Sequence, residues 1–293
     1  MPVTWTALAL IIGCGLAFSC LDLLRKVLGR SIRPMALLVY LAAGEVPLFL
    51  VWVLWFHSAG PRGDYWLPAT ASIVLNFLAN LAYLEAVRLS PLSLTVPFLS
   101  LTPVFATLLA IPILGEVPGP LAFLGIALVV AGALRLNLPP RAGNSPRVIW
   151  RSFSNEKGSV LMVAVAFFWS LALPLDKISI ARSSPAFHGL VLNCGIGLGA
   201  FLLLVRQHRG AELSIPRRRQ VQVVAAIVAS TLGLALQLFA LAVAWAGLVE
   251  TLKRAIGSTM AILLGFLIFG EPISWPKVIA VLLLAVGVAL VLH

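Results

Sequence analysis

Long apolar runs recur from one end of the chain to the other, and they limit its possible folds more than any other feature. Hydrophobic residues make up 61% of the sequence and charged residues 11%, whereas soluble domains carry roughly 25% charged residues. A helix needs about 20 apolar residues to cross the hydrocarbon core of a bilayer. Ten such spans fit the sequence, at residues 4–28, 34–56, 66–88, 92–114, 119–137, 158–181, 186–206, 219–244, 247–269 and 275–292. The sequence therefore predicts an all-α membrane protein with ten transmembrane helices.

The chain also resembles itself at an offset of 155 residues. Residues 106–116, which end in Gly-Glu, align with residues 261–271, which end in the same pair, and Gly132 then aligns with Gly287. A fixed offset of this kind is typical of duplicated structural units. The segment between the two copies is rich in Pro, Gly and Arg, which is typical of a connection. We therefore expect a first five-helix repeat over residues 1–137, a basic linker over 138–157 and a second five-helix repeat over 158–293.

Because five is an odd number, the second repeat enters the membrane in the opposite sense to the first. Inverted repeats of this kind allow transporters to open a site near the middle of the bilayer alternately to its two sides. Most Lys and Arg residues fall in the odd-numbered connections, so the positive-inside rule would place these connections in the cytoplasm and both termini outside. The net charge of +11 favours contact with membrane lipids over contact with nucleic acid.

Sequence patterns for catalysis or metal binding do not stand out. The three cysteines lie in apolar spans without a CxxC pair, and the chain has no HExxH, GxSxG, Walker A, GxGxxG or EF-hand pattern. We therefore expect a protein that is not an enzyme and has no cofactor and no metal. Its expected partners are a small-molecule substrate and membrane lipids, with self-association left open.

Charged residues inside the ninth span are the first candidate site. Glu250 precedes Lys253 and Arg254 by one helical turn, so the three side chains can share one face of the helix. A charge near the bilayer centre costs at least roughly 2.5–3.5 kcal/mol and needs a partner or a polar cavity. The two cations can bind an anionic group of the substrate, Arg as a planar fork and Lys as a point charge. The alternative is that both extend to the nearer membrane surface.

Polar residues in other spans are weaker candidates. Asn76, Asn80 and Tyr83 follow one stripe of the third span, which would line a cavity or join two helices. Trp169 and Asn193 could extend this lining. Further candidates are acidic: Glu45 in the second span, either a proton-coupling group or the partner of a cation, and Asp176, expected to form an interfacial pair with Lys177.

Taken together, these residues resemble the drug/metabolite transporter superfamily, in its EamA-like branch of two five-helix repeats. The resemblance is carried by residues 99–105 running to Leu114-Gly115-Glu116, and more loosely by the second copy ending in Phe269-Gly270-Glu271. It implies a secondary transporter whose central cavity is lined mainly by the third, fourth, eighth and ninth helices. It also implies cytoplasmic termini, against the distribution of basic residues.

A more specific resemblance lies in the ninth span. Residues 252–255 resemble the Lys-Arg pair with which sugar-phosphate translocators of this superfamily bind phosphate, so Lys253 and Arg254 would form the anion site. The chain departs from that pattern at Ser100, where a lysine is expected, and at Glu250, where an asparagine is expected. A carboxylate or a zwitterion is therefore as plausible a ligand as a phosphate.

The sequence thus predicts a secondary transporter in the bacterial inner (plasma) membrane. It would move a small polar metabolite, with an anionic or zwitterionic group, by alternating access. The alternatives are an exporter of amino acids or drugs, and a flippase of a phosphate-headed lipid.

Overall fold

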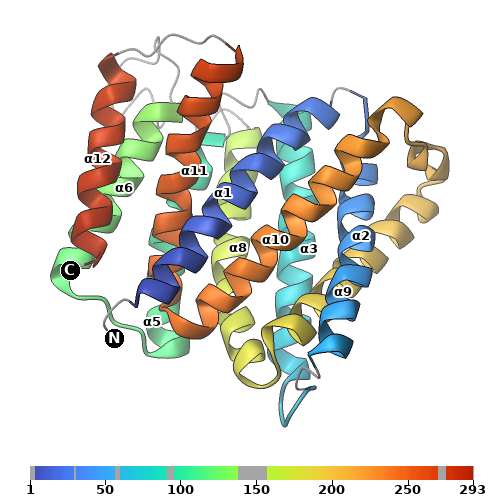
Figure 1. Ribbon diagram of the computed structural model, residues 1–293, viewed down its shortest axis with the longest axis horizontal. Helices are drawn as coiled ribbons and strands as arrows, with labels where there is room; N and C mark the ends of the chain where they lie inside the picture. The colour runs from blue at the N-terminus through green and yellow to red at the C-terminus, as the bar shows by residue number, and fades with distance from the viewer. Residues whose placement is uncertain are drawn as a thin grey trace. The chain divides into compact units, whose positions relative to one another are not determined.

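The computed structural model describes residues 4–29, 31–56, 60–90, 96–137, 157–269 and 275–292, and every regular element in these ranges is a helix (Figure 1). The α-helices are α1 (Trp5–Leu28), α2 (Pro34–Trp55), α3 (Trp66–Leu89), α5 (Thr102–Leu114), α6 (Pro120–Asn137), α8 (Lys157–Ala181), α9 (Pro185–Arg206), α10 (Gln220–Val243), α11 (Ala246–Phe269) and α12 (Trp275–Leu292). Three short 3-10 helices are η1 (Val96–Leu101), η2 (Gly210–Leu213) and η3 (Arg217–Arg219). The predicted all-α fold is confirmed. The predicted linker lies outside the described residues, except for Lys157.

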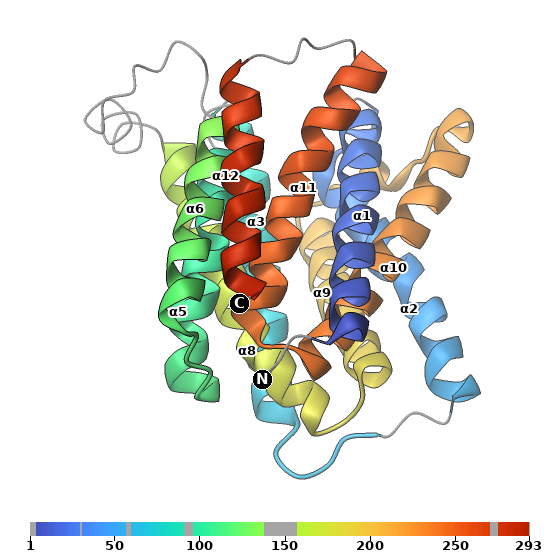
Figure 2. The same cartoon turned by 60° about the vertical axis from the view of Figure 1, so that its left-hand side comes forward.

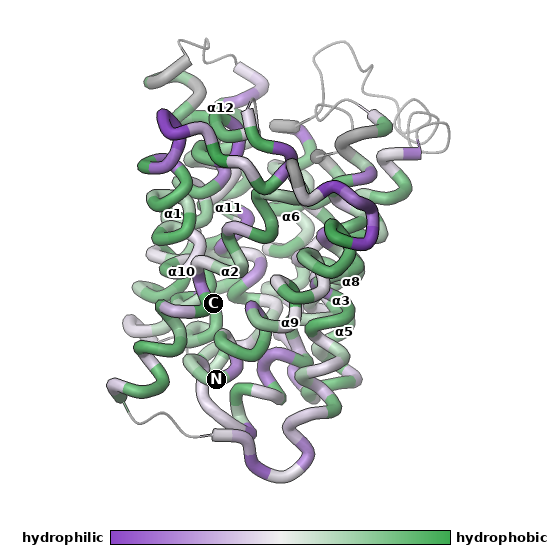
Figure 3. Tube along the Cα trace, turned by 90° about the vertical axis from the view of Figure 1, so that its right-hand side faces the viewer, coloured by the Kyte–Doolittle hydropathy of each residue, from purple (hydrophilic) through white to green (hydrophobic). Residues whose placement is uncertain are grey.

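Apolar residues run along the helices, and hydrophilic residues gather at their ends and in the connections (Figure 3). Within the described residues, seven segments are long and apolar enough to cross a membrane, namely α1, α2, residues 66–86 of α3, α8, α9, residues 217–243 and α12. The segments Phe98–Leu114 and Pro120–Arg135 are apolar but shorter. The remaining helix, α11, carries three charged side chains in its first three turns.

Short-range signals explain where several of these helices begin and end. The side chain of Thr4 accepts a hydrogen bond from the backbone N–H of Ala7, and that of Ser184 accepts one from Phe187, so both residues cap helix N-termini. At the end of α5, Gly115 adopts the left-handed conformation with φ of 69°, which glycine reaches without steric cost. This left-handed residue takes the backbone out of the helical path, so α5 ends at Leu114.

The fourth predicted span is not one regular α-helix. In the described residues it starts as the 3-10 helix η1 and becomes α-helical at Thr102. Pro103 has no N–H and cannot donate to the carbonyl of Leu99, four residues earlier. The hydroxyl of Thr102 lies 2.8 Å from that carbonyl oxygen and can donate to it instead. The change of helix type at Thr102 is therefore a local consequence of proline.

The described chain divides into two compact units that do not coincide with the two repeats. Unit 1 comprises Leu78–Pro174 and Trp245–His293 together with Met1, and unit 2 comprises Pro2–Phe77 and Leu175–Ala244. Helices α3 and α8 contribute residues to both units. Each unit therefore takes helices from both halves of the sequence.

In unit 1, α6 lies along α12 and α5 lies against α11 (Figures 1 and 2). Glycines bring α6 and α12 into backbone contact, since a Cβ added to Gly287 would lie 2.7 Å from the carbonyl oxygen of Gly125. Such small residues allow membrane helices to approach closely. Under the 155-residue offset α6 corresponds to α12 and α5 to α11, so both pairs join equivalent helices of the two repeats.

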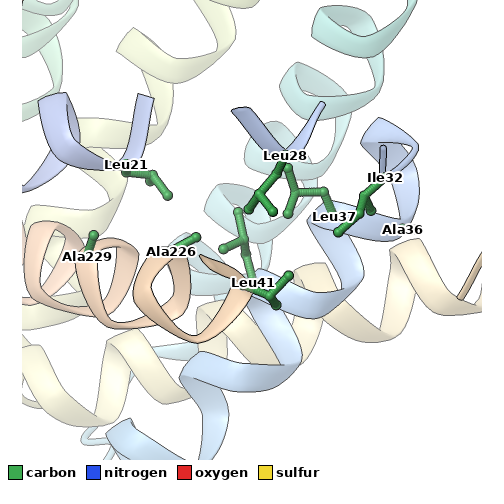
Figure 4. Packing of buried hydrophobic residues seen from close by; sticks show 9 residues of the cluster. Leu21, Leu28, Ile32, Ala36, Leu37, Leu41, Ala226 and Ala229 are labelled. Atoms are coloured by element: carbon green, nitrogen blue, oxygen red, sulfur yellow. The ribbon is translucent and has the colours of Figure 1, made fainter. Parts of the chain in front are cut away.

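In unit 2, α1 packs along α10 and α2 packs along α9. A buried apolar cluster joins α1, the following turn, α2 and α10 (Figure 4). It contains Leu21, Leu28, Ile32, Ala36, Leu37, Leu41, Val223, Ala226 and Ala229. Two glycines of this unit face large side chains instead: Gly189 faces Phe49, and Gly195 faces Ile73.

Candidate functional site

The charged residues of α11 form a compact ionic cluster inside unit 1. Glu250 is 3% exposed; its two carboxylate oxygens lie 2.5 Å from the Nζ atom of Lys253 and 3.5 Å from the Nη2 atom of Arg254. The side chains of Lys253 and Arg254 are 20% and 24% exposed. The carboxylate is thus the buried centre of the cluster, and the two cations are its partly accessible rim. The formal charge of the three residues is +1.

Thr102 of the facing segment completes this cluster. Its hydroxyl lies 2.7 Å from a carboxylate oxygen of Glu250 and accepts a hydrogen bond of 3.0 Å from Nη2 of Arg254. The hydroxyl carries one hydrogen, so it donates either to Glu250 or to the carbonyl of Leu99 at any one time. The proline-induced start of α5 therefore also places a hydroxyl among the charges of α11.

Arg254 contacts the carboxylate of Glu250 less closely than Lys253 does. Its distance to Glu250 is at the outer limit of a hydrogen bond, whereas Lys253 is in close contact with the carboxylate. The Nε atom of Arg254 is buried and has no hydrogen-bond partner among the described residues. A guanidinium has five donors in one plane and can bind a carboxylate or phosphate through two of them. Arg254 therefore has donor capacity left for an anion.

Two aromatic residues predicted as cavity lining meet in unit 1. The rings of Tyr83 in α3 and Trp169 in α8 have centroids 6.0 Å apart and planes tilted by 34°. Both pack against a buried cluster that includes Met162 and Leu99. Asn80, one turn before Tyr83, is half-buried in the same unit. The two rings are thus held by apolar packing.

The predicted stripe of α3 is divided between the two units, because Asn76 belongs to unit 2. Its side-chain amide donates to the backbone carbonyl and to the hydroxyl of Ser72, each at 3.1 Å. Ser72 donates in turn to the carboxylate of Asp176 in α8. Asn76 therefore helps to orient a buried acidic residue.

Asp176 was expected beside Lys177, but the partners that we find for it are Ser72 and His188, whose Nε2 atom lies 3.0 Å from its carboxylate. Adjacent side chains diverge by about 100° around a helix, so neighbours in sequence do not face each other. Lys177 points elsewhere and donates to the carbonyl oxygen of Ala244.

Glu45 has neutral partners in unit 2. It is 4% exposed, and the side chains of Ser230 in α10 and Asn193 in α9 hydrogen-bond to its carboxyl group. The amide of Asn193 also donates to the backbone carbonyl of Gly189 at 3.0 Å. The charge of Arg25 also acts on Glu45, so both interpretations, pairing with a cation and proton coupling, stay predictions. The side chain of Asn193 is thus a hydrogen-bond partner of Glu45.

Unit 2 also contains an apolar groove of about 710 Å³ between α1, α2 and α10. Its lining includes Leu48, Trp52, Leu232 and Phe239, with two threonines as the polar members. None of the predicted site residues is among the described residues that line it. Leu48 and Leu232 are more than 40% exposed, as expected for a surface that contacts lipid tails. We therefore do not assign the groove to a polar substrate.

The Gly-Glu pair that ends the fourth span has a structural role. After the left-handed turn at Gly115, a carboxylate oxygen of Glu116 accepts a hydrogen bond of 2.7 Å from the backbone N–H of Ala246, the first residue of α11. A carboxylate is favourable at a helix N-terminus, where the N–H groups lack partners. Glu116 therefore fixes the start of the helix that carries the ionic cluster. The second Gly-Glu pair lies outside the described residues.

Sequence reasoning found the three charges of α11 but missed Thr102, Ser230 and His188. Thr102 is next to a proline inside an apolar span, which is a local signal for a side chain that replaces a lost backbone donor. His188 is a lone histidine at the start of an apolar helix, where a buried polar side chain requires a partner. The identity of each partner depends on tertiary packing and is absent from the sequence pattern.

Comparisons with known proteins agree with this fold. The sequence model of the EamA-like transporter family matches residues 5–138 and again residues 156–293. The protein LicB of Haemophilus influenzae is 25% identical over 246 residues, covering 82% of this chain and 80% of LicB. One solved crystal structure superposes with a TM-score of 0.77 at 18% identity, covering 98% of this chain and 96% of the other, and this likeness shows the fold alone. The two family matches, one in each half, confirm the predicted two-repeat architecture, whereas the exact repeat boundaries stay a prediction.

Proposed function

The chain belongs to the EamA-like transporter family and is a membrane transporter of the drug/metabolite type, and on that premise we propose that it carries a small polar metabolite with an anionic or zwitterionic group. The observation that carries this proposal is the ionic cluster of α11. A buried carboxylate neutralises one of two cations, and the remaining positive charge stays on a partly accessible rim.

The cluster is suited to bind a substrate and release it again. Arg254 lies eight residues into α11, or about 12 Å along a helix that rises about 1.5 Å per residue. That depth approaches the middle of a hydrocarbon core about 30 Å thick. A net charge of +1 attracts one negative group, while Glu250 keeps the site from holding an anion permanently. The neighbouring Thr102 hydroxyl can reorient between two acceptors as the ligand binds.

Alternating access would follow from the inverted repeats. In unit 1 the pairs α5 with α11 and α6 with α12 join equivalent helices, and in unit 2 α2 with α9 does the same. Equivalent helices can exchange conformations, which opens a site to one side and then to the other. On this proposal the partners are the solute and the membrane lipids, and the location is the bacterial inner (plasma) membrane, which agrees with the bacterial source of LicB.

Thermal-shift measurements on the purified protein test the proposal. The probes are glucose 6-phosphate, succinate, alanine and ethidium, which represent phosphorylated sugars, dicarboxylates, amino acids and cationic drugs. We expect an anionic or zwitterionic probe to raise the melting temperature of the wild type and to lose this effect in Lys253→Ala/Arg254→Ala. Uptake of the same radiolabelled probe into proteoliposomes then tests transport itself.

The double variant leaves Glu250 unpaired and can fail to fold, so two further variants are needed. Arg254→Lys keeps the charge but removes the planar fork, and it should weaken stabilisation by a carboxylate or phosphate. Arg206→Gln removes an exposed cation at the end of α9 and should leave the effect unchanged. Stabilisation that survives both Arg254→Lys and the double change would exclude the ionic cluster as the binding site.

A further inference from the structure

Four buried polar side chains form a continuous hydrogen-bonded group in unit 2. The carboxylate of Asp176 accepts from the Ser72 hydroxyl and lies 3.0 Å from Nε2 of His188, and Nδ1 of His188 lies 3.2 Å from the Tyr65 hydroxyl. Tyr65, Ser72 and His188 are 0% exposed, and Asp176 is 4% exposed. Buried polar groups on this scale are costly unless each has a partner.

The bonds indicate where protons lie in one state of the group. Asn76 donates to the hydroxyl oxygen of Ser72, which directs the Ser72 hydrogen toward Asp176. A neutral imidazole with its hydrogen on Nε2 then donates to Asp176 and accepts from Tyr65 on Nδ1. Every hydrogen bond is satisfied in this state, but the group carries one buried negative charge. Adding one proton removes that charge.

The titratable and charged side chains on the surrounding elements are few, and the described contacts of two of the cations are to backbone carbonyls. Helix α10 has no titratable side chain; α2 contributes Tyr40 and Glu45, and Phe49 of α2 faces Gly189 next to His188. In α8 the nearest cation, Lys177, donates to Ala244. Arg62, Asp64 and Arg182 lie in the turns at this end, where the guanidinium of Arg182 donates to the backbone carbonyl of Asp64.

The group also lies close to one end of its helices. Asp176 is five residues before the end of α8 and His188 is three residues after the start of α9, so both are within about 8 Å of a helix end. Figures 1 and 2 show the end of α8, the start of α9 and the start of α3 gathered at the same end. Glu45, by contrast, is at least ten residues from either end of α2.

We propose that Asp176 and His188 form a reversible proton-binding site that exchanges one proton with the water at this end of unit 2. The proton comes from hydronium and leaves to water, and it resides on the imidazole or on the carboxylate while Tyr65 and Ser72 adjust their hydroxyl hydrogens. That this proton moves with or against the solute rests on the proposed function. Proton binding itself needs no solute, so either proposal can fail while the other stands.

Nuclear magnetic resonance of the full-length protein in lipid nanodiscs, labelled with ¹³C at histidine Cε1, tests the proposal. The chain has four histidines. A soluble gadolinium chelate broadens the resonances of exposed histidines, and the spared resonance that is lost in His188→Gln is assigned to His188. We expect the spared resonance to move from its neutral to its protonated position as the pH falls from 8.5 to 5. A spared resonance that stays constant over this range would overturn the proposal.

Three variants sharpen the measurement. His188→Gln should remove the titrating resonance, whereas His208→Asn should leave it, because His208 is exposed and its φ of 54° suits asparagine. Asp176→Asn keeps the acceptor oxygen but not the charge, and its His188 resonance should stay neutral down to pH 5. If the His188 resonance of Asp176→Asn moves with pH as it does in the wild type, the carboxylate takes no part in binding the proton. The proposed pair is then wrong.

Discussion

Units 1 and 2 both bury carboxylates, but they satisfy them with different chemistry. In unit 1, Glu250 is held by Lys253 and Arg254, two fixed cations. In unit 2, Glu45 and Asp176 are held by hydroxyls, an amide and an imidazole. An arginine stays charged at any physiological pH, whereas an imidazole changes charge within that range. On our two proposals, this difference separates a unit that attracts an anion from a unit that exchanges a proton.

Removing the carboxylate of unit 1 should give the largest loss of stability. Glu250→Gln removes the carboxylate that both Lys253 and Arg254 contact. Breaking a buried ion pair at one side costs about 3–5 kcal/mol. We expect a clearly lower melting temperature of the purified protein, followed by tryptophan fluorescence.

The control for this change is Glu250→Gln/Lys253→Met, which removes the anion together with its closest cation. It should recover part of the lost stability, because only one cation is then uncompensated. A single variant as stable as the wild type would show that the two cations do not depend on Glu250, and the contrast between the units would fail.

Removing the carboxylate of unit 2 should cost less. Asp176→Leu leaves Ser72 and His188 without their acceptor, and a buried donor without a partner costs about 1–3 kcal/mol. Asp176→Asn should cost less still, since both bonds go to the same oxygen, Oδ1, and an amide oxygen can accept both. The same melting experiment measures all three variants. A loss in Asp176→Asn equal to that of Glu250→Gln would mean that charge matters as much in unit 2 as in unit 1.

The units should also differ in how they tolerate a methyl group at a helix crossing. Gly287→Ala places a Cβ 2.7 Å from the carbonyl oxygen of Gly125, where backbone must move, and we expect a loss of about 1–3 kcal/mol. Gly195→Ala meets the Cγ2 methyl group of Ile73 at 2.6 Å, a side chain rather than backbone, so its loss should be smaller. Gly257→Ala, in open space within α11, is the control and should be neutral or stabilising by up to about 1 kcal/mol. Equal losses at Gly287 and Gly195 would contradict this distinction.

The smallest effect is expected at the surface of unit 2. Glu212 lies 2.7 Å from Nε of Arg209 and 2.9 Å from Nη1 of Arg33. The hydrogen bond from Arg209, together with the charges of both arginines, holds the pKa of Glu212 below its ordinary value. A carboxyl with a lowered pKa stabilises the fold at neutral pH and loses this contribution as the pH falls through that pKa.

Hydrogen exchange of residues 209–219 can detect this local effect. Glu212→Gln should speed exchange at neutral pH relative to the wild type, after allowance for the intrinsic rate. The difference should shrink when both are measured below the ordinary carboxyl pKa of 4.5. A difference that grows on acidification would contradict the direction of the pKa shift.

The sequence predicts the helices of this fold closely, because long apolar runs leave few alternatives in a membrane. Every predicted span overlaps a helix, and the main departure is the 3-10 start of the fourth, which follows from its prolines. The repeat predicts which helices are equivalent. It does not predict that each compact unit mixes helices of both repeats, since this depends on contacts between residues far apart in the chain.

The candidate site could be predicted from the sequence only where its residues lie on a single helix. The spacing of Glu250, Lys253 and Arg254 is local to one helix, so periodicity brings them together without tertiary information. Thr102 reaches the same cluster from 148 residues away. Asp176 shows the opposite case, because the sequence predicts its neighbour Lys177 as its partner, while the fold supplies His188 from the next helix.

The division into units has a consequence for how the protein is made. A ribosome delivers the first repeat to the membrane before the second, yet that repeat alone completes neither unit. Unit 2 has all its residues once Ala244 has been synthesised, whereas unit 1 also needs α11 and α12, which follow Ala244 in the chain. Thr102 is therefore synthesised well before Glu250, its partner in unit 1. Unit 1 therefore stays incomplete for longer than unit 2 while the chain is being made.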